Sequence, residues 1–213
     1  MSAEPSPLKP NMKYSKLPST DQIEKAAKNL TAHGIETIVV NSKDEALKAV
    51  VKMIPEQAEV FDVSSKTVEA IGLWDVIDKS GNYDSVRGDF ERLAKEGKSK
   101  ESRRLGAAPD YIVGSVHAVT EDGQAVISSA TGSQLAGYAS GAEHVIWVVG
   151  AQKIVPTLEE AFKRIQEYTF PLEDARARKA YGMGSGINKI LIVAREFKPK
   201  RISMVIVKEV LGF

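Results

Sequence analysis

The sequence predicts a single α/β domain of the Rossmann-like type, with a mostly parallel sheet covered by helices on both faces. Short apolar runs alternate with longer amphipathic patterns, which is typical of βαβ units. Two further pairs of runs are joined by polar turns and predict antiparallel hairpin strands. The most apolar run, HVIWVVG at residues 144–150, predicts a central strand buried on both faces. No repeat or linker interrupts residues 20–213, so we expect one domain there.

Residues 1–19 are predicted to form a flexible N-terminal arm. Three of the first ten residues are prolines and Pro18 is a fourth, which disfavours a helix. The segment has no apolar run of the kind that a signal peptide needs. No part of the chain approaches the roughly 18 consecutive apolar residues of a membrane span. We therefore expect a cytoplasmic protein that does not associate with a membrane.

The first half of the chain reads as helices alternating with strands. Ser19, Thr20 or Asp21 can cap the first helix, with Glu24 completing a capping box after Asp21, and Gly34 ends it. The elements that follow are a buried strand at 35–40, a helix at 44–53, a strand at 58–63, a helix at 68–78, a loop at 81–88 and a charged helix at 89–105.

The second half begins with a predicted hairpin. A strand at 111–119 is followed by a tight turn at Asp122-Gly123 and a partner strand at 124–129. The later elements are a short helix at 131–140, the central strand at 144–150, a helix from Pro156 to Tyr168, a flexible GMGSG at 182–186, and a closing hairpin of strands at 190–197 and 202–210.

Composition excludes several functional classes. The formal net charge of the 213 residues is +1, so the basic excess typical of a nucleic-acid binder is absent. The chain has no cysteine, which excludes a cysteine nucleophile and a thiolate-held zinc or iron–sulfur cluster within it. The three histidines have no i,i+4 spacing, so no metal site is predicted.

Two hydroxyl-rich loops are predicted to form a site for an anion. In open α/β sheets, ligands bind where loops follow the carboxyl ends of strands, and free amides there favour a phosphate or carboxylate. The alternative is that these hydroxyls only cap helices, a role worth about 1 kcal/mol without any ligand. The first loop offers Ser64, Ser65, Lys66 and Thr67, and the second offers Ser128, Ser129, Thr131, Gly132 and Ser133.

Three further side chains are candidates for chemistry. His117 can act as a general base, or it can be a structural histidine bonded to a backbone carbonyl. Glu121 is the candidate functional carboxylate, because the adjacent Asp122 belongs to the turn. Lys153 follows the central strand and can either reach an anion or be solvated.

The sequence resembles the LUD domain family of lactate-utilisation proteins over most of residues 21–213. The resemblance is carried by the succession TEDG, TGS, VVG and KIVP between residues 110 and 164, by AEVFDVSSKTVEAIGLWDVI, and by the closing RISMVIVKEVLGF. It implies a fold of the NagB/RpiA/CoA-transferase-like type. It also implies a part in lactate oxidation beside separate iron–sulfur subunits, without a reaction assigned to this subunit type.

The chain departs from this family pattern in two segments. The first loop, FDVSSKT, lacks the glycines that many members carry. KAYGMGSGINK stands where many relatives have a cysteine-bearing segment. Two hypotheses follow. One is an accessory protein that binds a small anionic metabolite or iron–sulfur partner subunits. The other is a sugar-phosphate isomerase-like or acyl-CoA-transferase-like enzyme, with Glu121 or His117 as base. The cofactor and a homo-oligomeric state stay open.

Overall fold

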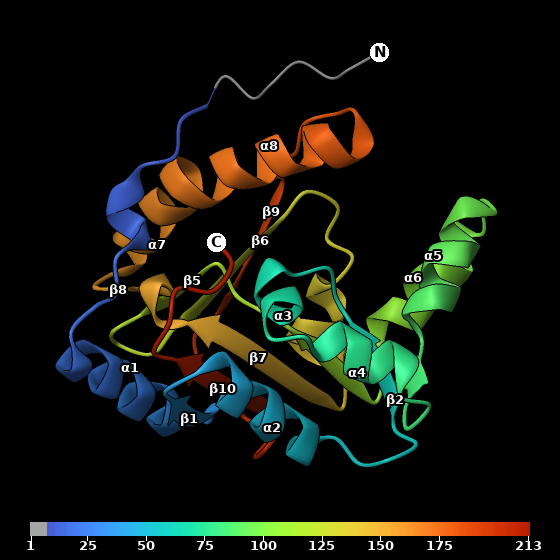
Figure 1. Cartoon of the computed structure of the whole chain (residues 1–213), viewed down its shortest axis with the longest axis horizontal. Coiled ribbons are helices and arrows are strands. Elements are labelled where there is room, and N and C mark those ends of the chain that lie inside the picture. Colours follow the sequence, from blue (N-terminus) through green and yellow to red (C-terminus); the bar gives the residue numbers. More distant parts are fainter. Residues whose placement is uncertain (1–7) are drawn as a thin grey trace.

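Two β-sheets form the frame of the molecule in the computed structural model, which describes residues 8–213 (Figure 1). In the first sheet all neighbouring strands are parallel, which confirms the α/β class. Its order is β1 (Glu36–Val40), β10 (Ile202–Val207), β7 (His144–Gly150), β4 (Tyr111–Gly114), β2 (Glu59–Asp62) and β3 (Asp84–Ser85). The second sheet has the order β8 (Ile154–Val155), β5 (Ala118–Thr120), β6 (Ala125–Ser129) and β9 (Lys189–Val193).

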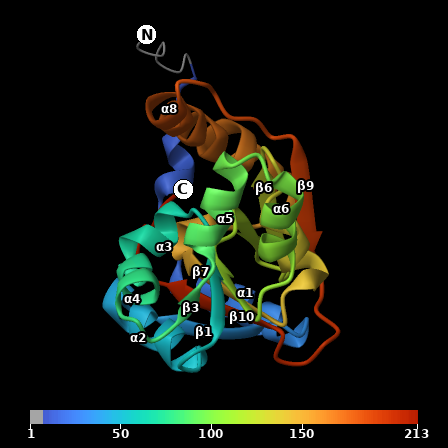
Figure 2. The same cartoon turned by 90° about the vertical axis from the view of Figure 1, so that its right-hand side faces the viewer.

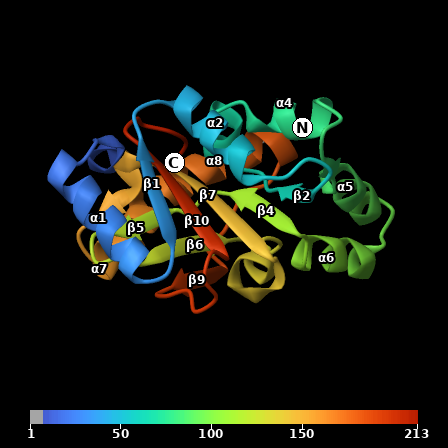
Figure 3. The ribbon, with the colours of Figure 1, turned by 90° about the horizontal axis from the view of Figure 1, so that it is seen from below.

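Strand β7 lies in the interior of the six-stranded sheet, between β10 and β4, as its sequence predicts (Figure 3). Successive side chains of a strand point to opposite faces. Trp147 and Val149 therefore join the core on one face, whereas Ile146 and Val148 join the core on the other. An uninterrupted apolar run is the pattern that burial on both faces requires.

The two faces of the first sheet are covered differently. One face packs against α2 (Lys43–Met53), α3 (Lys66–Ala70) and α4 (Leu73–Lys79). The other face packs against α1 (Thr20–Ala32) and against the inner side of the second sheet. Two charged helices, α5 (Arg87–Lys95) and α6 (Ser99–Ala107), lie near β2, where Phe90 contacts Phe61.

A long helical segment covers the outer side of the second sheet. It runs through α7 (Leu158–Arg164), the π-helical turn η4 (Ile165–Thr169) and α8 (Phe170–Tyr181). In Figure 2, α8 lies at the opposite end of the molecule from α2 and β1. The 3-10 turn η1 (Met12–Ser15) also packs here, because Tyr14 is buried and its hydroxyl bonds Glu160 at 3.1 Å. Asn11 and Tyr14 thus contact the domain, whereas most of residues 8–19 are exposed. The flexible arm predicted over 1–19 stays a prediction, and residues 1–7 of it lie outside the described residues.

Glycines divide two of the predicted helices. The helix expected at 68–78 is interrupted at Gly72, whose φ is +76°, and the one expected at 89–105 is interrupted at Gly97, with φ +77°. Both residues adopt the left-handed conformation that glycine accepts without steric cost. The first helix begins as expected, but Ser19 forms its capping box with Gln22 and not through Asp21 and Glu24. The helix expected at 131–140 starts later and ends in the π-helical turn η2 (Gly137–Gly141).

Two predicted strand arrangements are wrong. The run at 111–119 is not one strand, since β4 belongs to the first sheet and β5 to the second. The closing hairpin does not form either: β9 pairs with β6, and β10 inserts between β1 and β7. β10 is buried on nearly every residue and therefore needs an interior position, whereas β9 exposes its outer side chains at a sheet edge. β1 also lies at a sheet edge and is only partly buried, in contrast to the buried strand expected.

Candidate functional site

A cleft of about 850 Å³ opens at the carboxyl ends of β2, β4 and β7. Its walls include residues that directly follow these strands, namely Ser64, Ser115 and Lys153. After β2 the chain continues to the edge strand β3, whereas after β4 it enters β5 and β6 of the second sheet and returns to the first sheet at β7, on the other side of β4. Ligands of open α/β sheets bind where the connections of neighbouring strands diverge in this way. The cleft therefore occupies the position in the fold that is best suited to a ligand.

The two hydroxyl-rich loops predicted from the sequence both line this cleft. The second sheet brings its loop alongside the first, because β6 ends at Ser129 next to the cleft. Gly132 is not part of the wall; it has a φ of +86°, and its N–H donates to the Ser129 hydroxyl at 2.8 Å. The predicted binding residues that line the cleft are Ser64, Ser65, Lys66, Thr67, Ser129, Thr131, Ser133 and Lys153.

Several of the loop hydroxyls are occupied by bonds within their own loops. The Ser65 hydroxyl accepts the Val68 amide at 3.4 Å as a helix cap, and the Thr131 hydroxyl accepts the Ser133 amide at 3.4 Å. These two hydroxyls therefore bond backbone amides of their own loops, as the alternative without a ligand predicts. Ser128 also lines the cleft, and its hydroxyl has no hydrogen-bond partner among residues 8–213. It is therefore more available to a ligand than its neighbours.

Lys153 is the most unusual group of the cleft. The side chain is only 2% exposed, and Nζ donates to Thr67 Oγ1 at 2.9 Å, to Ser115 Oγ at 3.0 Å and to the Val116 carbonyl at 3.1 Å. No carboxylate of residues 8–213 forms an ion pair with it. Burial, and then the nearby charge of Arg164, holds the pKa of Lys153 well below its usual value. The solvated lysine that the sequence allowed is instead a buried amine that no carboxylate of residues 8–213 pairs with.

His117 presents a hydrogen-bond donor to the cleft and not a base. Its Nδ1 accepts the Ser128 amide N–H at 3.1 Å, so in the neutral ring the proton resides on Nε2. Nε2 has no acceptor among the described residues. Burial, followed by the charges of Lys153 and Arg164, lowers the pKa of His117 to about 3. The imidazole is therefore neutral near pH 7, and the general-base role expected for it does not fit this geometry.

Arg164 is a second buried cation, directly behind the cleft wall. It is fully buried and donates to the His117 carbonyl and to Thr169 Oγ1 at 2.9 Å, while its Nη2 has no partner. Burial lowers the pKa of Arg164 to about 10. The sequence analysis did not single out this residue. A signal was present, because a charged residue interrupts the apolar face that Ala161, Ile165 and Tyr168 form on this helix.

Glu121 does not belong to the cleft, which corrects its predicted role as a base there. Its carboxylate accepts Gln22 Nε2 at 2.8 Å and Lys25 Nζ at 2.9 Å. These hydrogen bonds lower the pKa of Glu121. Both partners lie on α1, so the side chain joins that helix to the turn of the second sheet. Glu121 is absent from the cleft wall, and its role in the fold is structural.

The other charged groups of the cleft are paired with each other. Arg87 bonds the buried Asp62 at 3.2 Å and stacks on Trp74, with the guanidinium carbon 4.3 Å from the ring centroid. Lys66 pairs with Glu69 at 2.5 Å, and Arg176 pairs with Glu173 at 2.7 Å. These cations are thus neutralised by the protein itself, in contrast to Lys153.

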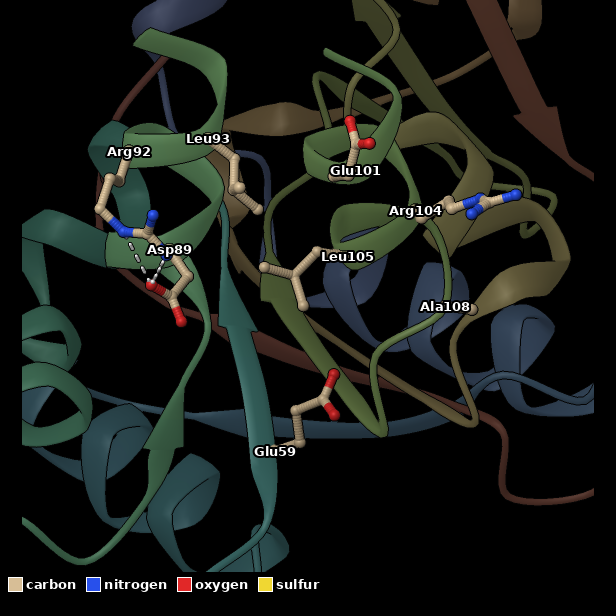
Figure 4. Close-up of a pocket in the computed structure, with 8 residues that line it drawn as sticks. All are labelled: Glu59, Asp89, Arg92, Leu93, Glu101, Arg104, Leu105 and Ala108. Carbon is tan, nitrogen blue, oxygen red and sulfur yellow. Dashed lines mark hydrogen bonds and ion pairs between the residues drawn. The ribbon is translucent and has the colours of Figure 1, made fainter. Parts of the chain in front are cut away.

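A second, shallower hollow of about 450 Å³ lies between α5, α6 and β2 (Figure 4). Its charged side chains are of both signs, and Arg92 turns toward Asp89, to which it bonds at 2.8 Å. Arg92 also pairs with Glu96 at 3.0 Å. The remaining lining residues are Glu59, Leu93, Glu101, Arg104, Leu105 and Ala108. Because its charges are of both signs and it holds no buried cation like Lys153, this hollow offers no comparable site.

Within residues 8–213, no three His, Asp or Glu side chains are placed so that they could hold a metal ion together. The same residues contain no helix that is long and apolar enough to cross a bilayer.

Comparisons with known proteins agree with this architecture. The family model of the LUD domain matches residues 23–207. A crystal structure of a DUF162 family protein from Deinococcus radiodurans is similar to this chain, with a TM-score of 0.58 and 15% identity. The similarity covers 90% of this chain and 99% of that one, and at this identity it shows a shared fold. No curated protein matches the sequence.

Proposed function

The chain belongs to the LUD domain family, and we propose that it binds a small anionic metabolite in the cleft at the carboxyl ends of β2, β4 and β7. The observation that carries this proposal is the buried amine of Lys153, which three neutral oxygens surround and which no carboxylate of residues 8–213 neutralises when it is protonated. A buried charge without a counterion is costly. A carboxylate or phosphate in the cleft would supply that counterion.

The neutral donors of the cleft support an anionic ligand as well. The Nε2–H of His117 and the Ser128 hydroxyl both lack protein partners, and both residues line the cleft. Arg87, Lys66 and Arg176 of the wall are paired with Asp62, Glu69 and Glu173, so Lys153 is the cationic group that the described residues leave without a carboxylate. A positive charge left unpaired in a low-dielectric cleft attracts and orients anions.

We place this binding function in lactate utilisation, in the cytoplasm. A 2-hydroxy carboxylate offers a negative charge for Lys153 and a hydroxyl for the neutral donors, so lactate and its oxidation product pyruvate suit the cleft chemically. The chain has no cysteine to hold an iron–sulfur cluster, and the electron transfer of lactate oxidation would therefore need separate partner subunits. We expect this protein to act beside such subunits as an accessory component.

Isothermal titration calorimetry with L-lactate, D-lactate, pyruvate and inorganic phosphate tests the binding site. We expect at least one of these anions to bind, and Lys153→Met to abolish its binding while keeping the unbranched stem. Lys25→Met is the matched control, because Lys25 is an exposed lysine that pairs with Glu121 outside the cleft. Equal binding by wild type and Lys153→Met, or no binding of any of the four anions, refutes the site.

The pathway is tested separately in the source organism. Deletion of the gene should impair growth on lactate but not on glucose, and an affinity-tagged protein should co-purify with iron–sulfur subunits. Normal growth of the deletion strain on lactate contradicts this part of the proposal and leaves the binding site itself to the calorimetry.

One observation favours a second candidate, an enzyme of the sugar-phosphate isomerase-like or acyl-CoA-transferase-like kind. Strongly perturbed titratable groups cluster at catalytic sites, and the cleft contains both Lys153 and His117. With Glu121 outside the cleft, such an enzyme would have to use Lys153 as its base. Incubating sugar phosphates with the protein in D₂O, and following deuterium incorporation by NMR, separates turnover from simple binding.

A further inference from the structure

We propose that the Lys153 amine forms an imine with the carbonyl carbon of a 2-oxo acid held in the cleft. This inference rests on the proposed anion site and assigns to it a covalent step and a substrate class. Three features of the site support it: the partners of Nζ, the lack of a carboxylate of residues 8–213 among them, and the hydrogen-bond donors nearby.

The surroundings of Nζ suit a neutral amine as well as an ammonium. Two of its three partners are the hydroxyls of Thr67 and Ser115, and a hydroxyl can donate as readily as it accepts. Thr67 already donates to the Leu211 carbonyl at 3.2 Å, so it accepts from Nζ. The Ser115 hydroxyl donates to the Val116 carbonyl at 3.3 Å, and by rotating away from this long bond it can donate to the nitrogen lone pair instead, while Nζ keeps its own bond to that carbonyl. A carboxylate partner would instead hold the lysine protonated.

The electrostatic setting also favours the neutral form. Lysine is a nucleophile only when deprotonated, and desolvation beside another cation is a known way to achieve this near neutral pH. Lys153 is buried, and Arg164 lies close enough to lower its pKa further. Lys66 in the same cleft is exposed and paired with Glu69, so it lacks both features.

Two neutral donors are available for the oxygens of the substrate. The Nε2–H of His117 can bond the carbonyl oxygen as negative charge develops on it, because the imidazole stays neutral. The Ser128 hydroxyl can bond the carboxylate. A 2-oxo acid carries both groups on neighbouring carbons, which is why this class fits the site better than a simple aldehyde or a bare carboxylic acid.

The step balances without any other reactant. The nitrogen lone pair forms the C–N bond, the carbonyl π electrons move to oxygen, and one amine proton is transferred to that oxygen. The resulting carbinolamine then breaks its C–O bond, and the hydroxyl leaves as water with the second amine proton. The product is a C=N bond between Nζ and the substrate carbon. The Ser115 hydroxyl, at 3.0 Å, can relay these protons.

Borohydride trapping tests the inference on the wild-type protein. We incubate the full chain with pyruvate, add sodium borohydride, and analyse the product by intact mass and peptide mapping. The expected result is a single adduct, heavier by one pyruvic acid less one oxygen atom, on the peptide that contains Lys153. L-Lactate has no keto group, so it should give no adduct and should slow labelling by pyruvate. No adduct, or label spread over exposed lysines such as Lys66, overturns the inference.

Lys153→Met should lose the adduct, but peptide mapping of the wild type locates it even if that variant does not fold. The calorimetric titration of pyruvate distinguishes the two levels of the argument. Binding of pyruvate without trapping refutes the imine and leaves the anion site intact, whereas absence of both binding and trapping refutes the two together.

Discussion

The ammonium of Lys153 lies 2.9 Å from the hydroxyl of Thr67, although the two residues are 86 positions apart in the sequence. This bond joins the turn after β7 to the loop after β2, which are not neighbouring strands. Ser115, which follows the intervening strand β4, completes the contact at 3.0 Å. The carboxyl ends of three parallel strands thus converge on one buried amine, and the predictions below start from it.

Lys153→Met should leave the folded protein as stable as the wild type or raise its free energy of unfolding, by about 1 kcal/mol at pH 7. The substitution removes a buried cation without a counterion, and residues selected for function often reduce stability. Urea denaturation measures the difference. A loss of more than about 2 kcal/mol would mean that the three hydrogen bonds of Nζ outweigh the cost of burying it.

The wild type and Lys153→Met should also differ in how their free energy of unfolding depends on pH. The folded pKa of Lys153 lies below its unfolded value of 10.5, so the unfolded chain binds more protons between these two pKa values. Wild-type stability should therefore rise relative to Lys153→Met as the pH increases through this window toward 10.5. A constant difference between the two proteins over that range contradicts the lowered pKa.

Binding of an anion without a keto group, such as L-lactate or inorganic phosphate, should be accompanied by proton uptake at Lys153. An opposite charge beside the amine raises its pKa, so molecules with a neutral amine gain a proton when the anion binds. The calorimetric enthalpy should then vary with the ionisation enthalpy of the buffer, and this variation should vanish in any residual binding by Lys153→Arg. Around the amine, His117 has a pKa of about 3 and Arg164 a pKa of about 10, so neither titrates near neutral pH. Burial raises the pKa of Asp62, which bonds Arg87 of the cleft wall, to about 7, so only the part of the effect that Lys153→Arg removes belongs to Lys153.

His117→Asn should weaken anion binding by roughly 10-fold, since it removes one hydrogen bond to a charged ligand. The Asn oxygen can still accept the Ser128 amide, so the fold should be retained. The folded pKa of His117 lies below the usual 6.5, and wild-type stability should therefore fall as the pH drops from about 6.5 toward 3. NMR of the wild type should show an imidazole that does not titrate between about pH 5 and pH 8. A ring that titrates near pH 6.5 contradicts this assignment.

Sequence patterns predicted much of the α/β frame because the burial of a strand can be recognised from the apolar residues of that strand alone. The run at 144–150 is apolar at every position after His144, and β7 is buried on both faces. The loops at 64–67 and 128–133 were predicted to share a site because both follow strands, and both line the cleft. The second loop follows β6 of the second sheet, so the two loops meet because the two sheets pack together and not because their strands lie in one parallel sheet.

Features that depend on contacts between distant segments were not predictable in the same way. Alternation of apolar residues tells which face of a strand is buried but not which strand lies beside it, so β9 and β10 were paired wrongly. Glu121 resembled a functional carboxylate until Gln22 and Lys25, from a helix about 100 positions earlier, were found to hold it. The burial of Lys153 was not predictable for the same reason. Thr67 and Ser115, which bond its amine, lie far from it in the sequence.

Gly114→Ala should destabilise the protein, because the new methyl group has no room between the side chains that pack against this residue. A Cβ at this position would lie 1.8 Å from Tyr138 Oη and 2.4 Å from Val63 Cγ2, so both side chains would have to move. Tyr138 is fully buried and cannot turn into solvent. Overpacking of this kind costs about 1–3 kcal/mol, and we expect a value at the upper end of that range. The melting temperature should then fall by roughly 2–4 °C for each kcal/mol.

A double-mutant cycle tests this contact directly. Tyr138→Phe removes the oxygen and leaves the next ring atom 3.1 Å from the new Cβ, so Tyr138→Phe should recover part of the stability that Gly114→Ala loses. The recovery should be incomplete, because the contact with Val63 remains. Gly88→Ala serves as the control, since a Cβ there meets nothing within 4 Å and should leave the melting temperature nearly unchanged or slightly higher. If Gly114→Ala melts like Gly88→Ala, or if Tyr138→Phe gives no recovery, the close approach of β4 to Tyr138 is not the constraint that shapes this wall.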